Sequence, residues 1–157
     1  MQPKLDSARL NRGVALLQLG QYANASAQLE ALFADEHAAH RADAAYHDAI
    51  ALDRLGRAAD AEAWLDKARA LDETLDAALL YQGALRERRG DLQSAGRAYL
   101  AYLNAHPDST QAMLRFGLAA QKSGRIDVAK QYLQKVIAQA PRSLDAVEAR
   151  KYLVLWE

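Results

Sequence analysis

Apolar residues recur along this chain at the spacing of an amphipathic helix. In the segment AYLAYLNAH, Tyr99 is followed three and four residues later by Tyr102 and Leu103. The segment AKQYLQKVIAQA repeats this spacing at residues 133, 136 and 137. Such spacing places the apolar side chains on one face of a helix, and the strict alternation typical of a strand is absent from the sequence. The pattern predicts an all-α fold.

A glycine followed five residues later by an alanine marks a repeat. These glycines are Gly20, Gly56, Gly90 and Gly124, at intervals of 36, 34 and 34 residues. Glycine adopts the left-handed conformation that ends a helix without a steric penalty. Each of the four therefore predicts a tight turn between two helices. This interpretation also explains Arg89-Gly90-Asp91, which has the letters of an adhesion tripeptide but stands at the third turn. We expect Asp91 to begin the next helix, where an acid is favoured.

Residues of defined size flank each turn glycine. A small residue stands seven positions before it and a large one nine positions after it. The small residues are Gly13, Ala49, Gly83 and Gly117, and the large ones are Leu29, Leu65, Tyr99 and Leu133. A small residue lets two helices approach closely, and a large one fills the space between layers. Pro107 and Pro141 close the third and fourth units, because proline stops a helix. Each unit is predicted to be a pair of antiparallel helices.

The combined pattern, small-x6-Gly-x-hydrophobic-x2-Ala-x3-large with a period near 34 residues, resembles the tetratricopeptide repeat (TPR) family. The resemblance covers four units, at about residues 6–41, 42–75, 76–109 and 110–143, and a segment at 144–157 similar to the family's capping helix. The early tryptophan of the repeat is missing, with Arg9, Ala45, Leu79 and Met113 in its place. The resemblance implies a right-handed superhelical α-solenoid of about nine helices, in a single domain over residues 1–157.

Composition and charge narrow the classes of partner. Lysine plus arginine equals aspartate plus glutamate, 20 against 20, and this balance argues against a nucleic acid partner. No apolar run approaches the roughly 18 residues of a membrane span, so no membrane insertion is expected. The absence of cysteine excludes disulfides and thiolate metal sites. Without an apolar stretch like that of a signal peptide, the cytoplasm is the default location; the periplasm is the alternative if an export signal has been removed.

The histidines are the best candidates for chemistry in this sequence. His37 and His40 could share a helical face, but His47 lies seven residues further on, roughly 10 Å along a helix. We therefore expect a polar linker between repeats, with an adventitious metal pair as the alternative. The sequence has no P-loop, dinucleotide-binding glycine pattern or nucleophile elbow. We predict a non-enzymatic protein with no catalytic residue, no cofactor and no metal site.

The TPR resemblance implies that the first helix of each pair lines a concave groove that holds an extended peptide. Repeat positions five, six, nine and thirteen then define the groove. They give Leu10, Asn11, Val14 and Gln18 in the first unit, Tyr46, His47, Ile50 and Arg54 in the second, Leu80, Tyr81, Ala84 and Arg88 in the third, and Leu114, Arg115, Leu118 and Lys122 in the fourth. Tyr22, Tyr99 and Tyr102 match core positions instead.

The predicted groove has an apolar and aromatic centre and a basic edge, formed by Arg54, Arg88 and Lys122. A protein segment with apolar anchors and acidic groups, or with a free carboxylate, would suit it. The alternative is that these cations are ordinary solvated charges near helix C-termini. The lysine and asparagine clamp of chaperone-tail-binding family members is not reproduced, since Leu10 and Val14 stand at the corresponding positions.

The sequence thus favours a TPR adaptor for a protein or peptide partner. Its alanine- and arginine-rich composition is typical of bacterial proteins and suggests a role in envelope or pilus assembly. One alternative is self-assembly, as a homodimer through the C-terminal helix, where Val147, Leu153, Leu155 and Trp156 are apolar. The same residues could instead pack on the fourth unit. Two further alternatives are a secretion chaperone of the short TPR class, whose members usually have three units, and an RNA-binding helical repeat, which zero net charge disfavours.

Overall fold

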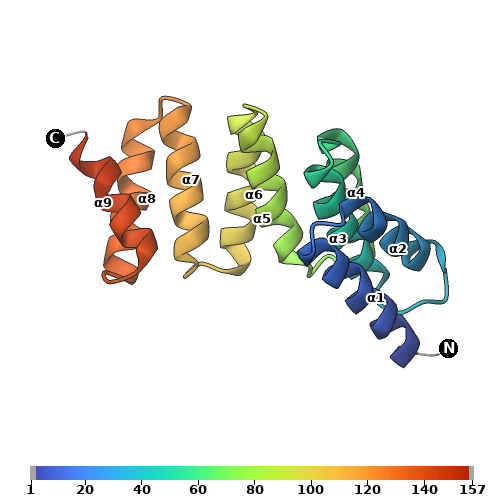
Figure 1. The fold of residues 1–157 in the computed structure, drawn as a ribbon. Coiled ribbons are helices and arrows are strands. Elements are labelled where there is room, and N and C mark those ends of the chain that lie inside the picture. The colour runs from blue at the N-terminus through green and yellow to red at the C-terminus, as the bar shows by residue number, and fades with distance from the viewer. Residues whose placement is uncertain (1–2, 156–157) are drawn as a thin grey trace. The chain divides into compact units, whose positions relative to one another are not determined.

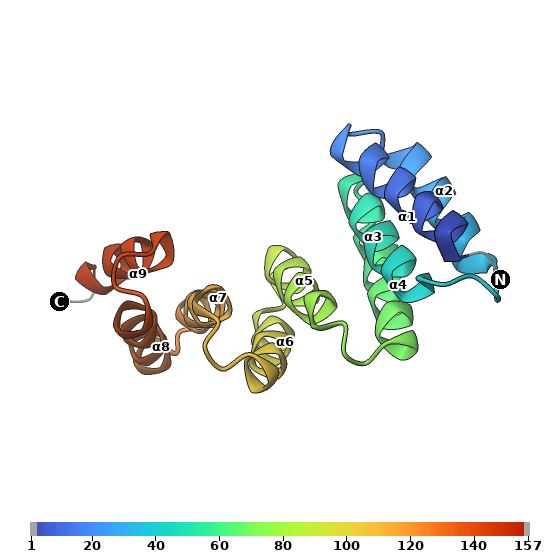
Figure 2. The same ribbon diagram turned by 90° about the horizontal axis from the view of Figure 1, so that it is seen from below.

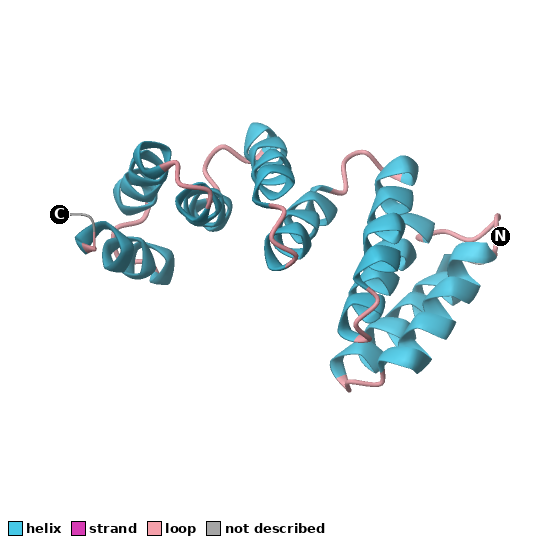
Figure 3. Ribbon diagram, turned by 90° about the horizontal axis from the view of Figure 1, so that it is seen from above, coloured by secondary structure: helices cyan, strands magenta, loops and turns pink. Residues whose placement is uncertain are grey.

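The computed structural model describes residues 3–155, which form nine α-helices joined by short loops (Figure 1). The helices are α1 (Pro3–Gln18), α2 (Tyr22–Ala34), α3 (Arg41–Arg54), α4 (Ala58–Leu71), α5 (Asp76–Arg88), α6 (Leu92–Ala105), α7 (Thr110–Lys122), α8 (Ile126–Gln139) and α9 (Leu144–Val154). Within residues 3–155 there is no strand (Figure 3). The predicted all-α fold and its helix pairs are confirmed. Among the described residues, no helix combines the length and apolar character that crossing a membrane requires.

The chain divides into two compact units, Met1–Ala78 and Leu79–Glu157, and the boundary falls in the first turn of α5. In the first unit α2 packs against both α1 and α3, and α3 packs against α4. In the second unit α5, α7 and α9 lie along one side and α6 and α8 along the other (Figure 2). Because the chain divides into two units, the single domain expected over residues 1–157 remains a prediction.

All four turn glycines adopt the conformation that the repeat pattern predicts. Their φ angles are 73°, 78°, 82° and 79°, in the left-handed region. At Gly90 the amide donates to the carbonyl of Glu87, and the next amide, of Asp91, donates to the carbonyl of Arg86. The same two bonds recur at the other three turns, and this pair of bonds defines a Schellman motif. The Asp91 side chain accepts from the amide of Ser94 and begins α6, as predicted.

In three of the four repeats, the small residue before the turn glycine is itself a glycine and lies against the large residue of the same repeat. A Cβ atom added at Gly83 would lie 2.4 Å from the Tyr99 ring, and one added at Gly13 would lie 2.6 Å from Leu29. At Gly117 the corresponding distance to Leu133 is 3.1 Å. These glycines let the two helices of a pair approach closely, and the large residues that fill the contacts are fully buried.

Asp48 is a charged residue inside the first unit. Its exposed fraction is 0%, and neither carboxylate oxygen has a hydrogen-bond partner of good geometry. Burial raises the pKa of Asp48 from 3.8 to about 6, and the nearby Ser26 hydroxyl only partly offsets that effect. The charged form of Asp48 therefore destabilises the folded first unit near neutral pH.

The linker between the first two repeats is an ordered polar turn. His40 has a φ of 65° and lies between the Ser7 hydroxyl, 3.1 Å from Nε2, and the Asp43 carboxylate, 3.3 Å from Nδ1. The amide of Ala39 donates to Asp6, whose carboxylate is nearly buried. Within the described part of the chain, no three or more histidine, aspartate or glutamate side chains gather in a way that could hold a metal ion. The contacts of His40 are those of a linker.

The C-terminal helix α9 divides its apolar residues between two faces. Its N-cap is Ser143, whose hydroxyl accepts from the amide of Ala146. Leu153 packs against the core of the second unit, as one of the two alternatives predicted. Val147 and Leu155 are 45% and 75% exposed, so the prediction that they pack on the fourth repeat is wrong. Trp156 lies outside the described residues.

Candidate protein-binding site

The first unit carries a hollow of about 330 Å³ between α1 and α3, which we call the α1–α3 hollow. The residues that line it are Val14, Leu17 and Gln18 from α1, Tyr22 from the start of α2, and His47, Ile50 and Arg54 from α3. The helical period explains this set, because residues three and four positions apart lie on one face of a helix. The hollow therefore has an apolar wall with polar groups at defined positions.

Five of these seven residues stand at the repeat positions predicted to face a partner. They are Val14, Gln18, His47, Ile50 and Arg54. Sequence reasoning missed Leu17 and assigned Tyr22 to the core, although the Tyr22 side chain is half-buried and lines the hollow. A comparison of repeats could have identified Tyr22. The second residue after the turn glycine is aromatic only in the first repeat, and it is Ala58, Leu92 and Ile126 in the others.

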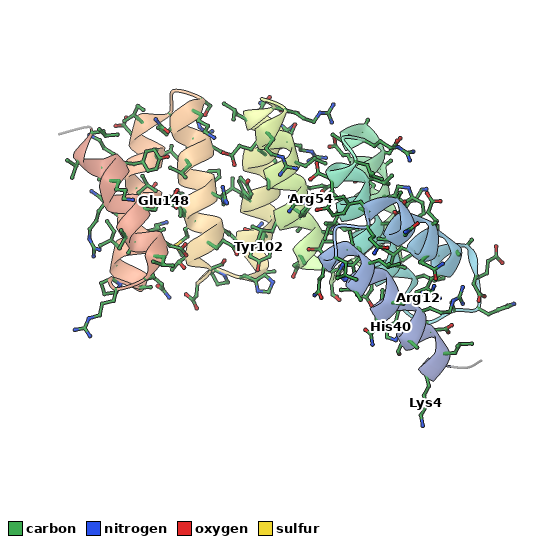
Figure 4. All side chains as sticks on the ribbon, viewed as in Figure 1. Lys4, Arg12, His40, Arg54, Tyr102 and Glu148 are labelled. Atoms are coloured by element: carbon green, nitrogen blue, oxygen red, sulfur yellow. The ribbon has the colours of Figure 1, made fainter. Side chains whose placement is uncertain are left out.

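The charge in the α1–α3 hollow comes from Arg54. Its side chain is exposed at the end of α3 (Figure 4) and makes no ion pair with any described residue. His47 is half-buried, and burial lowers its pKa while the nearby Asp43 carboxylate raises it by a smaller amount. The imidazole is therefore neutral at neutral pH and can both donate and accept a hydrogen bond. The hollow as a whole offers apolar contact, an imidazole, an amide and one cation.

The remaining predicted residues of the first unit lie outside this hollow. Leu10 is half-buried and packs against the core cluster that contains Leu29 and Leu32. Asn11 is exposed. Tyr46 packs edge-on against the His47 ring, with centroids 5.1 Å apart, and burial raises the pKa of its hydroxyl. Tyr46 thus supports the position of His47.

In the second unit, two of the predicted contacts are wrong because the side chains are buried. Leu114 and Leu118 are 4% and 5% exposed and belong to the core of that unit. They lie on α7, which packs against α6, α8 and α9. Leu80 packs against the same core and is half-buried. The more accessible predicted residues of this unit are Tyr81, Arg88, Arg115 and Lys122.

The predicted basic edge is incomplete, because Lys122 is paired. Its ammonium group donates to the Glu87 carboxylate, which also accepts from the Tyr99 hydroxyl at 2.9 Å. The Glu87 side chain is 8% exposed, so its charge requires this compensation. Burial, and then the neighbouring Glu87 charge, raises the pKa of Tyr99. Lys122 therefore acts within the second unit by linking α7 to α5 and α6.

A second hollow, of about 360 Å³, lies in the second unit between α6, α7 and the start of α8. Gly96 and Phe116 lie against each other here, with Leu100, Arg97 and Arg125 around them. At the position of Gly96 the other repeats have Ser26, Glu62 and Lys130, so the missing side chain helps to open this hollow. Its residues stand outside the repeat positions predicted to bind a partner.

Comparisons with known proteins agree with this geometry. Sequence models described as tetratricopeptide repeat match residues 10–76, and residues 77–109 and 111–143. The chain belongs to the tetratricopeptide repeat family, whose members are generally non-catalytic scaffolds for protein–protein interaction. A search of curated protein sequences found no match.

Several solved structures share the fold. MamA from Desulfovibrio magneticus RS-1 is 22% identical, with a TM-score of 0.77 over 88% of this chain and 77% of that one. PilW, described as a widely conserved type IV pilus biogenesis factor, is 20% identical, with a TM-score of 0.86 over 94% of this chain and 67% of that one. A tetratricopeptide repeat protein from Parabacteroides merdae ATCC 43184 is 16% identical, with a TM-score of 0.82 over 92% and 57% of the two chains. These likenesses show the solenoid fold of helix pairs.

Proposed function

We propose that this protein is a non-enzymatic adaptor that binds a segment of a protein partner in the α1–α3 hollow. One observation carries the proposal: an apolar wall on α1 and α3 ends beside Arg54, a cation without an ion pair among the described residues. Apolar side chains from a partner can bury their surface against Val14, Leu17 and Ile50. A carboxylate placed next to them can pair with Arg54.

The chemistry of the hollow defines the kind of segment that it selects. The neutral imidazole of His47 and the amide of Gln18 can each bond to a peptide backbone or a polar side chain. The segment should therefore combine one or two large apolar residues with an acidic side chain or a C-terminal carboxylate. Lysine- or arginine-rich segments should be rejected because of Arg54.

A peptide selection tests this proposal directly. Peptides selected from a random display library against the wild-type protein should be rich in apolar and acidic residues. Arg54→Ala should weaken their binding by roughly 3- to 10-fold, and more at low salt than at high salt. Ile50→Asp should reduce binding further, because it places a carboxylate in the apolar wall.

Arg57→Ala is the matched control. Arg57 lies three residues from Arg54 in the same unit, but it pairs with Asp60 and does not line the hollow. Binding should be unchanged in this variant. Peptides that bind equally well to wild type, Arg54→Ala and Ile50→Asp would contradict the proposed site.

The second unit supplies further candidate contacts in Tyr81, Arg88 and Arg115, which stand at the groove positions of the third and fourth repeats. Their combined replacement by alanine should weaken the binding of a segment that contacts the second unit and leave that of a segment confined to the α1–α3 hollow unaffected. If both segments bind normally, recognition is confined to the first unit.

Envelope or pilus assembly is the cellular role that we assign to the adaptor. The likeness in fold to PilW, a type IV pilus biogenesis factor, supports this assignment, together with the alanine- and arginine-rich composition of the sequence. Deletion of the gene in its own organism should reduce surface pili or disturb another envelope assembly. The Arg54→Ala and Ile50→Asp variants should fail to restore the function, whereas Arg57→Ala should restore it.

A further inference from the structure

The outer face of α9 is an unusual concentration of exposed apolar surface. Of the nine large apolar side chains that are exposed in the described part of the chain, three belong to this face, namely Leu144, Val147 and Leu155. Leu144 is 87% exposed and Leu155 is 75% exposed. A clustered apolar patch of this kind is typical of an interaction surface, unlike single exposed leucines.

Six residues form this face and line an open hollow of about 500 Å³: Leu144, Val147, Glu148, Lys151, Tyr152 and Leu155. They succeed one another at intervals of three, one, three, one and three residues, which places them along one side of the helix. The opposite side of α9 packs inward through Ala146 and Ala149, both fully buried. Five of the six residues are therefore directed away from the core of their own unit, whereas Tyr152 is half-buried and also packs against that core.

The order of residues on this face is symmetric about its centre, which lies between residues 149 and 150. Leucine stands at both ends, an apolar or aromatic residue follows from either end, and the centre holds two opposite charges. When two copies of such a helix pair antiparallel about a two-fold axis, Leu144 lies level with Leu155 of the other copy, and Glu148 lies level with its Lys151. The face is thus complementary to itself in both apolar character and charge.

We propose that a second copy of this chain occupies this face, through antiparallel pairing of the two α9 helices. Glu148 (marked on α9 in Figure 4) and Lys151 make no ion pair with any residue of the described chain. Two-fold pairing gives each of them an opposite charge on the other copy, and the symmetry makes this contact twice. The exposed leucines at the two ends then cover each other.

The size of the face determines the strength of the dimer. A helix of eleven residues is roughly 16 Å long, so the contact buries less area than the about 1,200–2,000 Å² of a stable interface. We therefore expect a reversible dimer with a dissociation constant on the order of 100 μM. This association is independent of the α1–α3 hollow, so either proposal can fail without the other.

Sedimentation equilibrium up to about 1 mM protein, at low salt where charges are weakly screened, measures this association. The wild type should change from monomer to dimer over that range. Glu148→Lys and Lys151→Glu should each weaken self-association by roughly fivefold or more, because like charges then meet at both contacts. Both residues are exposed, and far-UV circular dichroism should show unchanged helix content. Asp108→Lys, an exposed charge reversal in a loop of the same unit, is the matched control and should dimerise like the wild type.

Charge exchange then tests the antiparallel arrangement. Mixing Glu148→Lys protein with Lys151→Glu protein should restore a heterodimer as strong as the wild-type dimer, because each contact again joins opposite charges. The double variant Glu148→Lys/Lys151→Glu should also dimerise like the wild type. A wild type that stays monomeric up to about 1 mM, or charge variants that dimerise unchanged, would overturn the proposal. A mixture that associates much more tightly than the wild type would indicate parallel pairing and would also overturn it.

Discussion

Replacing Gly83 with alanine tests the close approach of the two helices in the third repeat. Gly83 lies inside α5, where alanine alone would stabilise the helix by about 1 kcal/mol. The added Cβ, however, would lie 2.4 Å from Cε1 of Tyr99. The Tyr99 ring cannot move away easily, because it is fully buried and its hydroxyl donates to Glu87 at 2.9 Å. Overpacking of a well-filled site costs about 1–3 kcal/mol, and a stiff neighbour places this site at the upper end.

We therefore expect Gly83→Ala to lower the free energy of unfolding by about 2 kcal/mol overall. Urea unfolding followed by far-UV circular dichroism measures the change as a shift in midpoint at constant slope. Gly96→Ala is the matched control in the same unit. Its Cβ would lie 3.5 Å from Phe116, an ordinary contact, so this change should stabilise the protein by up to about 1 kcal/mol.

The double variant Gly83→Ala/Tyr99→Leu completes this test. The second repeat already combines an alanine and a leucine at these two positions, Ala49 and Leu65, and both are fully buried. Leucine at position 99 should remove the clash. The loss in free energy of unfolding of the double variant should therefore be smaller, by about 1–2 kcal/mol, than the sum of the losses of the two single variants. Additive effects, or a Gly83→Ala protein as stable as the wild type, would refute the close packing of α5 on α6.

Three further predictions address the turns, the caps and the buried acid. Gly56→Ala should lower the free energy of unfolding by about 1–2 kcal/mol in urea unfolding, because φ is 78° at this position, even though no atom obstructs the new Cβ. Gly56→Asn should lower it by less. Ser109→Ala should cost about 1 kcal/mol by removing the cap that accepts from the amide of Ala112, and Ser109→Asp should retain the cap. Asp48 has a pKa raised from 3.8 to about 6, so the native state binds more protons than the unfolded state between about pH 4 and pH 6. Stability should therefore fall as pH rises through that range, and Asp48→Asn should remove this part of the pH dependence; an unchanged profile would contradict the burial of the charge.

The repeat architecture could be predicted because it depends on local stereochemistry. Gly20, Gly56, Gly90 and Gly124 each end a helix, since few other residues adopt a positive φ at low cost. The contacts of Gly83 with Tyr99 and of Gly117 with Leu133 follow from the same period. The helix boundaries predicted from the repeat agree with those of α5 and α7, which begin at Asp76 and Thr110.

The candidate site could be predicted only in part, because exposure depends on packing from other helices. Ile50 and Leu118 stand at the same position of their repeats, so the sequence alone does not distinguish them. Ile50 nevertheless lines the α1–α3 hollow, whereas Leu118 is buried in the core of the second unit. Likewise Arg54 and Lys122 share a repeat position, but Lys122 pairs with Glu87, which lies 35 residues earlier in the chain. No local pattern in the sequence contains such contacts.

The most direct test of the account is site-specific photo-crosslinking of a selected, acidic and apolar peptide to the whole protein. A photoreactive residue at position 50, in the α1–α3 hollow, should form a covalent adduct with the peptide, and excess unlabelled peptide should suppress the adduct. The same residue at position 66, which is exposed on α4 outside the hollow, should form none. Equal adducts at both positions, or an adduct at position 66 alone, would contradict binding in the hollow.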